Sequence, residues 1–243
     1  MKDLATILAD SHESGDPIVI GAFDVSRAFD SWIHAQALLA AYQQGVNLRV
    51  TSVLYDMYCR LKARIKIGNH ITSVVVPVKK GVRQGSLLST SLYNNSVLNA
   101  QACVNVSCIS KNINVSLLTY ADDLLNLSRS IRGLQSNFSI LRDEYRKIGL
   151  AFNTSKSAVL FFNDSLSQPE HLLLGSESIT VSSHVVYLGL PIGRNLNETR
   201  LLLVKHVEKK LRTTYGSIVA SRLLLCRKYL ANMYNAVALP HIL

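Results

Sequence analysis

Cysteine and proline provide few structural landmarks in this sequence. The four cysteines (Cys59, Cys103, Cys108 and Cys226) form no CxxC pair and no paired spacing with histidines. Zinc sites and disulfide frameworks usually show such spacings, so the sequence indicates neither, and a reducing, intracellular setting is expected. The five prolines are isolated, and no repeat, low-complexity segment or sharp linker is visible.

Long apolar runs are absent as well. No run approaches the roughly 18 residues that span a bilayer, and charges interrupt the first ten residues. We therefore expect no secretion signal, no membrane partner and a location in the nucleus or cytoplasm. With 48% hydrophobic and 17% charged residues, the 243-residue chain is expected to form one continuous globular unit with an appended lobe.

Acidic residues are scarce relative to basic ones. There are 26 lysines and arginines against 16 aspartates and glutamates, which gives a net charge of +10. This excess indicates a polyanionic partner, either a nucleic acid or an anionic membrane surface.

Hydrophobic periodicity predicts an alternation of strands and helices. Strands are expected over 16–25, 115–120, 124–128 and 158–162, a hairpin around Gly68-Asn69, and a short β segment over 185–192. Helices are expected over 26–45, 87–102 and 131–149, followed by two basic helices. The predicted fold class is α+β, an antiparallel sheet with helices on one face and then a helical, basic lobe.

Two adjacent carboxylates interrupt one of the predicted hairpins. Asp122 and Asp123 follow Ala121 at its tip, where their like charges repel each other unless a cation lies between or beside them. Asp24 ends another predicted strand. If the two strands are neighbours, three carboxylates converge at one rim of the sheet, an arrangement suited to two Mg²⁺ ions, with Mn²⁺ as a possible substitute. A solvated turn is the alternative for any one of these residues.

Several short motifs occur in a characteristic order. They are "FDVSRAFD" (23–30), "GVRQGSLLS" (81–89), "YADD" (120–123), "GLAFNTSKS" (149–157) and "YLGLPI" (187–192). In this order the chain resembles the palm region of the reverse transcriptases of non-LTR (LINE-type) retrotransposons. The resemblance implies a polymerase-type palm that attaches deoxynucleotides to a primer 3′-hydroxyl on an RNA template.

The resemblance implies roles for the first and third motifs. Asp24 and Asp122 would coordinate both metal ions, the carbonyl of Val25 would complete a site, and Asp123 would belong to the same cluster. Phe29 would exclude a ribose 2′-hydroxyl, although a packing role at a helix start is equally compatible with its position. Asp30 is more compatible with a helix cap or an ion pair than with a metal ligand.

The resemblance also implies nucleic-acid contacts. Arg83, Gln84 and Gly85 would contact the template and nucleotide, with a solvated charge as the alternative for Arg83. Lys156 would place an ammonium near the leaving pyrophosphate, or lie free on the surface. Tyr187, Leu188 and Gly189 would form the primer grip.

The carboxyl-terminal region is the most basic part of the chain. Residues 194–228 contain nine lysines and arginines and only two glutamates. Leu201, Val204, Val207, Leu211 and Tyr215 predict an apolar face for one helix. Lys205, Lys209 and Arg212 would then line a duplex backbone, with a solvated face as the alternative.

The chain departs from the family pattern in two places. Only 23 residues precede Asp24, so most of the fingers region, with its triphosphate contacts, is expected to be missing. Ser89-Thr90 stands where the family usually has Ser-Pro. We expect a palm over 1–193 and a partial thumb over 194–243. The alternatives are a catalytically silent nucleic-acid-binding module and another palm-type enzyme such as a cyclase, although a cyclase needs no long basic surface.

Overall fold

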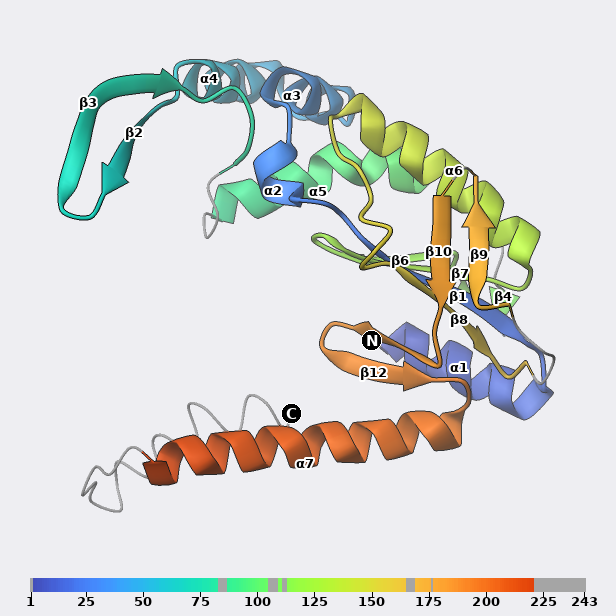
Figure 1. The fold of residues 1–243 in the computed structure, drawn as a ribbon. Helices are drawn as coiled ribbons and strands as arrows, with labels where there is room; N and C mark the ends of the chain where they lie inside the picture. The colour runs from blue at the N-terminus through green and yellow to red at the C-terminus, as the bar shows by residue number, and fades with distance from the viewer. Residues whose placement is uncertain are drawn as a thin grey trace.

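The computed structural model describes residues 2–82, 87–104, 109–110, 113–164, 169–175 and 177–220 (Figure 1). The helices are α1 (Lys2–Ser14), α2 (Ala28–Ser31), α3 (His34–Gln43), α4 (Leu48–Cys59), α5 (Leu87–Ala102), α6 (Ile131–Lys147) and α7 (Leu196–Ala220). The first seven strands are β1 (Ile18–Asp24), β2 (Lys62–Ile67), β3 (His70–Pro77), β4 (Ile109–Ser110), β5 (Ile113–Asn114), β6 (Leu117–Tyr120) and β7 (Asp123–Ser128). The other five are β8 (Ala158–Phe162), β9 (His171–Leu174), β10 (Glu177–Val181), β11 (His184–Tyr187) and β12 (Leu190–Gly193).

A six-stranded sheet forms the centre of the molecule, in the order β6-β7-β1-β8-β10-β9. Strand β1 pairs antiparallel with β7 on one side and with β8 on the other. Only the β8–β10 pair is parallel among the pairs described in this sheet. The predicted α+β class is confirmed, and the predicted antiparallel arrangement holds for β1, β6, β7 and β8.

Both faces of the sheet are covered. On one face, Leu134, Phe138 and Leu141 of α6 pack with Val19 and Phe23 of β1. On the other face, α1 and the β11–β12 hairpin pack against alternate residues of the same strands, with Leu4, Ile7, Leu8, Ile18, Ile20 and Ile192 among the cluster. Successive side chains of β1 point to opposite faces of the sheet, so alternate residues of this strand pack in two different cores.

Helix α1 covers a face of the sheet for which no helix was predicted. Helix α1 was not among the predicted helices, yet Leu4, Ile7 and Leu8 are each no more than 5% exposed. Their spacing places them on one side of a helix, and the charged residues lie on the other. The expectation of helices on one face was thus incomplete.

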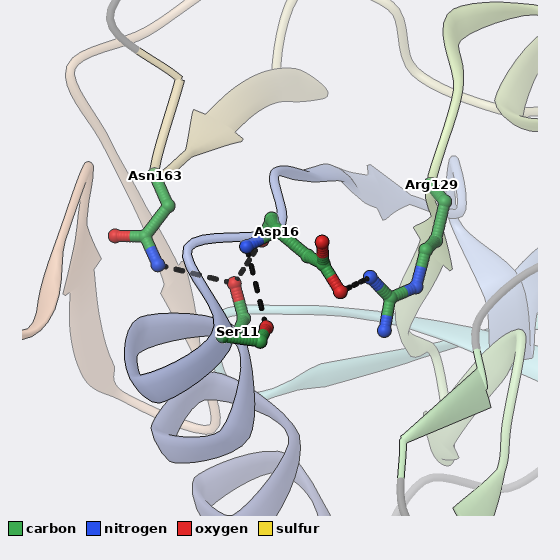
Figure 2. Close-up of polar contacts among 5 residues, drawn as sticks. Ser11, Asp16, Arg129 and Asn163 are labelled. Carbon is green, nitrogen blue, oxygen red and sulfur yellow. Dashed lines mark hydrogen bonds and ion pairs between the residues drawn. The ribbon is translucent and has the colours of Figure 1, made fainter.

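A polar network ties α1 to the end of the sheet where β1 begins (Figure 2). The Ser11 hydroxyl donates to the Asp16 carbonyl and accepts from Asn163 Nδ2 at 3.2 Å. Arg129, which follows β7, forms an ion pair with the Asp16 carboxylate. These contacts join α1, β1, β7 and β8 at the end of β1 opposite Asp24.

The single helix predicted over 26–45 is interrupted. Helix α2 ends at Ser31, and α3 begins at His34 after Ile33 in an extended conformation. Ile33 forms a bridge with Lys80, and the Trp32 indole donates to Ser96 Oγ at 2.9 Å. Tertiary contacts of the buried Trp32 thus override the helical periodicity at this point.

Two elements extend away from the sheet. The β2–β3 hairpin, with its turn at Gly68-Asn69, confirms the predicted hairpin, and Figure 1 shows it beyond α4. Helix α7 runs past the opposite end of the molecule in the same view. The second predicted basic helix lies outside the described residues. No helix in the described part of the chain is long and apolar enough to cross a membrane.

Candidate functional site

The three predicted carboxylates belong to one end of the central strand pair. Asp24 is the last residue of β1, and Asp123 is the first residue of β7. These two residues face each other in the antiparallel register, and Asp122 lies in the adjoining β6–β7 turn. The turn is tight, with Ala121 at φ 52°. The strands that carry the acids are therefore neighbours, as their convergence requires.

The electrostatic environment of Asp123 reflects this arrangement. Its pKa is raised above the ordinary value of 3.8, first by desolvation and then by the charges of Asp122 and Asp24. Each of these effects disfavours a third negative charge. Bound cations would instead stabilise the negatively charged form of Asp123. Among the described residues, however, no three His, Cys, Asp or Glu side chains are gathered as a metal-binding group.

The backbone of Asp24 is fixed by the segment before β8. The Asp24 N–H donates to Ser157 Oγ at 3.2 Å, and the Asp24 carbonyl accepts from the Asn153 N–H at 2.8 Å. Ser157 is buried, and its hydroxyl in turn donates to the Asn153 carbonyl at 2.8 Å. The first metal-ligand candidate is therefore held by residues more than a hundred positions away.

The same segment orients Val25. Val25 and Phe152 form an antiparallel bridge whose hydrogen bonds use the Ser26 N–H and the Asp24 carbonyl. In such a bridge the central residue directs its own N–H and C=O away from the partner segment. The Val25 carbonyl consequently points away from residues 151–153, toward the side of β1 on which β7 lies.

Phe29 rests on a buried tyrosine. It lies in α2, partly buried, with its ring 5.2 Å from the ring of Tyr93 in α5. Tyr93 is fully buried, and its hydroxyl has no hydrogen-bond partner among the described residues. Burial raises its pKa, as do, to a smaller extent, Tyr145 and Asp122. Tyr93 thus contacts the Phe29 ring and lies within electrostatic reach of Asp122.

The segment that leads into the predicted template-binding loop is attached to α2. The Val82 N–H donates to the Phe29 carbonyl at 2.7 Å, and the Gly81 N–H donates to the Trp32 carbonyl at 2.8 Å. His34 Nε2 lies 2.6 Å from the Gly81 carbonyl oxygen. Gly81 has φ 85°, and a Cβ there would meet the Asp30 backbone at 3.0 Å. Arg83, Gln84 and Gly85 themselves lie outside the described residues.

Two further predicted residues, Lys156 and Asp30, are both exposed. Lys156 is exposed in the turn directly before Ser157, the residue bonded to Asp24. Asp30 is exposed in α2 and lines a pocket of about 360 Å³ together with Lys62 and Lys80.

The predicted primer grip is a tight hairpin turn on the opposite face of the sheet from α6. Leu188 and Gly189 connect β11 to β12 with φ values of 51° and 76°. Tyr187 is buried in the core that contains α1. Its pKa is raised by desolvation and, to a smaller extent, by the charge of Asp123, which shows that this hairpin lies within electrostatic reach of the carboxylates.

Helix α7 places its cations in solvent. Lys205, Lys209 and Arg212 are all exposed, and their spacing puts them on one side of the helix. Leu201 and Val204, which were expected to form a packing face, are 63% and 57% exposed. That expectation is wrong for these two residues, because the described contacts of α7 are mainly with β12.

Sequence reasoning missed three residues of this region. Ser157 and Asn153 lie within "GLAFNTSKS", but the motif drew attention only to its lysine. Tyr93 lies on the helix after "GVRQGS", where an aromatic residue in an amphipathic pattern looks like any other core residue. Burial of a hydroxyl without a partner is visible only in three dimensions.

Residues 3–192 match the family described as "Reverse transcriptase (RNA-dependent DNA polymerase)". Among curated proteins, the chain is 25% identical over 201 residues to the Pol polyprotein of the type-1 retrotransposable element R2 from Bradysia coprophila, covering 77% of this chain and 23% of that protein. It is 25% identical over 234 residues to the RNA-directed DNA polymerase from the mobile element jockey of Drosophila melanogaster, covering 91% of this chain and 25% of that protein. The chain thus spans about a quarter of these relatives.

A solved structure shares the fold. Apo telomerase from Candida tropicalis, truncated from its C-terminal domain, matches 79% of this chain and 37% of that chain. The TM-score is 0.54 at 14% sequence identity.

Proposed function

Because the chain belongs to the reverse transcriptase (RNA-dependent DNA polymerase) family, we propose that it acts as the palm of an RNA-directed DNA polymerase. The resemblance to non-LTR reverse transcriptases is confirmed by the family match and by the R2 and jockey relatives. The proposed reaction is attack of a primer 3′-hydroxyl on the α-phosphate of a deoxynucleoside triphosphate, with pyrophosphate leaving.

One observation carries the proposal. The register of β1 with β7 sets Asp24 opposite Asp123, next to the turn that holds Asp122. Like charges concentrated at a strand end are unfavourable unless function requires them, and the raised pKa of Asp123 shows that they interact.

Enzymes of this family generally use divalent metal ions. We assign Asp24, Asp122 and the Val25 carbonyl as ligands of two Mg²⁺ ions, which Mn²⁺ could replace, with Asp123 in the same cluster. The donors fit, since both ions prefer oxygen ligands. Bound ions would activate the primer hydroxyl and neutralise the leaving group.

The remaining residues would position the substrates. Phe29, supported by Tyr93, would lie against the sugar, and the loop with Arg83, Gln84 and Gly85 would hold the template base and nucleotide. The exposed Lys156 ammonium would act on the pyrophosphate as a fixed charge or proton donor.

The β11–β12 turn and helix α7 would bind the template-primer duplex. The turn of Tyr187, Leu188 and Gly189 would face the primer, and Lys205, Lys209 and Arg212 would contact the duplex backbone. This assignment divides the chain into a palm over 1–193 and a partial thumb over 194–243.

Primer extension on an RNA template tests the function. Asp24→Asn and Asp122→Asn are each expected to abolish incorporation with Mg²⁺ or Mn²⁺, while leaving duplex affinity nearly unchanged. Asp143→Asn, an exposed carboxylate on α6, serves as the matched control and should retain activity. An equal loss of binding in both site variants would show that these carboxylates serve folding or docking instead.

A catalytically silent nucleic-acid-binding module is the second candidate. It is compatible with the exposed cations of α7, Lys205, Lys209 and Arg212, since binding of a phosphate backbone needs no catalytic metal. Template-primer binding without any incorporation in Mg²⁺ or Mn²⁺ would support this alternative and exclude the polymerase.

A further inference from the structure

His34 is a buried histidine to which the proposed function assigns no role. It is the first residue of α3 and is 3% exposed. Its ring centroid lies 6.0 Å from that of Trp32 and 4.8 Å from that of Tyr58 in α4. Trp32 is held in turn by the hydrogen bond from its indole to Ser96 of α5. The orientation of the imidazole is therefore fixed by contacts that involve α3, α4 and α5.

Only one nitrogen of the His34 ring has a hydrogen-bond partner among the described residues. Nε2 lies 2.6 Å from the Gly81 carbonyl oxygen, whereas Nδ1 is buried without a partner in that part of the chain. A carbonyl oxygen can only accept, so Nε2 carries the proton and donates it. Burying Nδ1 unpaired has a free-energy cost that an apolar side chain of similar size would avoid. The bond to Gly81, rather than packing, therefore explains an imidazole at this position.

The segment that His34 contacts is also bonded to α2 and its C-cap through backbone groups. The Gly81 N–H donates to the Trp32 carbonyl at 2.8 Å. The Val82 N–H donates to the Phe29 carbonyl at 2.7 Å. These two bonds do not depend on side chains, because both partners are backbone groups. The bond to the Gly81 carbonyl does depend on one, since only the side chain of His34 supplies its donor.

Gly81 lies between two groups assigned above to the incoming nucleotide. On one side it is joined through Val82 to Phe29, whose ring would lie against the sugar. On the other side it leads into residues 83–85, which would contact the template base and the nucleotide. A shift of the Gly81 peptide would change the position of one contact relative to the other. Misplacement of a substrate by about 1 Å can cost on the order of a hundredfold in rate.

We propose that His34 is a positioning residue, which holds the Gly81 carbonyl and so sets residues 83–85 in place relative to Phe29 for nucleotide binding. This inference rests on the proposed function and adds a residue to it. It places the effect of His34 on the nucleotide and not on the duplex, because the duplex is assigned to the β11–β12 turn and α7.

Amide hydrogen exchange in the full chain, without nucleic acid, tests the positioning directly. His34→Phe keeps an aromatic ring and removes the donor, whereas His34→Gln keeps an N–H donor and removes the ring. In His34→Phe the amides of residues 80–82 should exchange about tenfold faster, the scale of one lost hydrogen bond. In His34→Gln they should stay close to wild type. The amides of β1 should be unchanged in both variants.

Nucleotide affinity tests the consequence. The chain is bound to a template-primer whose primer lacks a 3′-hydroxyl, and the Kd of the next complementary deoxynucleotide is measured from the stability of the ternary complex. His34→Phe should raise this Kd about tenfold through loss of the same bond, while the Kd of the template-primer itself stays unchanged. His34→Gln should recover most of the nucleotide affinity.

His171→Phe is the matched control, because His171 is an exposed histidine of β9, and it should match wild type in both measurements. Equal exchange at residues 80–82 in wild type and His34→Phe would overturn the proposal, as would an unchanged nucleotide Kd. A larger defect in His34→Gln than in His34→Phe, or faster exchange in β1 as well, would also overturn it by assigning His34 to packing. Neither measurement requires incorporation, so a chain that incorporates no nucleotide refutes the proposed function separately.

Discussion

At the scale of single residues, Asp123 bears a charge that the folded chain disfavours. Its raised pKa means that the folded state holds the proton more tightly than the unfolded state does. The resulting loss of stability is absent below the ordinary carboxyl pKa of 3.8 and develops as pH rises through the folded-state value. Asp123→Asn should therefore raise the melting temperature at neutral pH in the presence of a chelator.

Thermal melts of both proteins across pH 3 to 8 provide the measurement. The difference between Asp123→Asn and wild type should shrink to nothing at the acidic end. A constant difference at every pH would show that the substitution acts through packing rather than charge.

The support of Phe29 by Tyr93 also belongs to this scale. Tyr93→Leu removes the ring 5.2 Å from Phe29, so selection against ribonucleotides should fall about tenfold, as it should in Phe29→Val. Tyr93→Phe keeps the ring and should retain the selectivity. The ratio of kcat/KM for deoxy- and ribonucleotides decides the point, and equal ratios in wild type and Tyr93→Leu would remove Tyr93 from this role.

The Ser157 hydroxyl also contacts the candidate site, through the Asp24 N–H. Ser157→Ala leaves the Asp24 N–H without its hydroxyl acceptor, which costs on the order of 1–3 kcal/mol when the group is buried. We expect a lower kcat with little change in KM for template-primer. Ser157→Thr keeps a hydroxyl and should restore part of the rate, whereas equal defects in both variants would point to a purely structural effect.

At the scale of elements, α7 provides the clearest test. The Asn195 side chain accepts from the Glu198 N–H at 2.9 Å, and Glu198 Oε2 accepts from the Arg194 N–H, so two backbone donors at the helix start have side-chain acceptors. Replacing Lys205, Lys209 and Arg212 with glutamine should reduce the salt slope of duplex binding by about 0.9 for each lost phosphate contact. Fluorescence anisotropy over a salt series measures it, and an unchanged slope would mean that this side of α7 faces only solvent.

The elements that sequence predicted well share strong periodicity. Helices α5 and α6, strand β8 and the hairpin at Gly68-Asn69 lie where their patterns predicted them. Helix α1 and strands β9 and β10 were not predicted: β9 and β10 are only four and five residues long, and the apolar side of α1 has a partner only once the sheet exists. The break at Ile33 could not be foreseen either, since it depends on Lys80, 47 positions along the chain.

The three carboxylates of the candidate site could be predicted from the sequence, but the residues that hold the site in place could not. Motif order placed Asp24, Asp122 and Asp123 at strand ends, and antiparallel pairing of β1 with β7 then makes them neighbours. The hydroxyl of Ser157 and the ring of Tyr93 act through contacts that span 133 and 64 residues. No local pattern encodes such contacts.

At the scale of the whole molecule, one sheet serves two cores. Ile7 lies in the core on one face and Leu134 in the core on the other, and both are fully buried. Ile7→Ala and Leu134→Ala should each lower the free energy of unfolding by about 2–5 kcal/mol within a single cooperative transition. Urea unfolding followed by circular dichroism and tryptophan fluorescence checks this expectation. A separate early transition in Ile7→Ala alone would show that α1 unfolds independently of the sheet.

The turn at Gly68-Asn69 has consequences for how such a chain can change over time. Both strands that flank it are exposed, so added residues there meet neither core, and exposed loop tips are where insertions are best tolerated. Descendants of this sequence could lengthen or shorten the hairpin while the end of the sheet that bears Asp24, Asp122 and Asp123 stays constant. The same property makes the turn a suitable place for grafting a fluorescent reporter or an affinity tag.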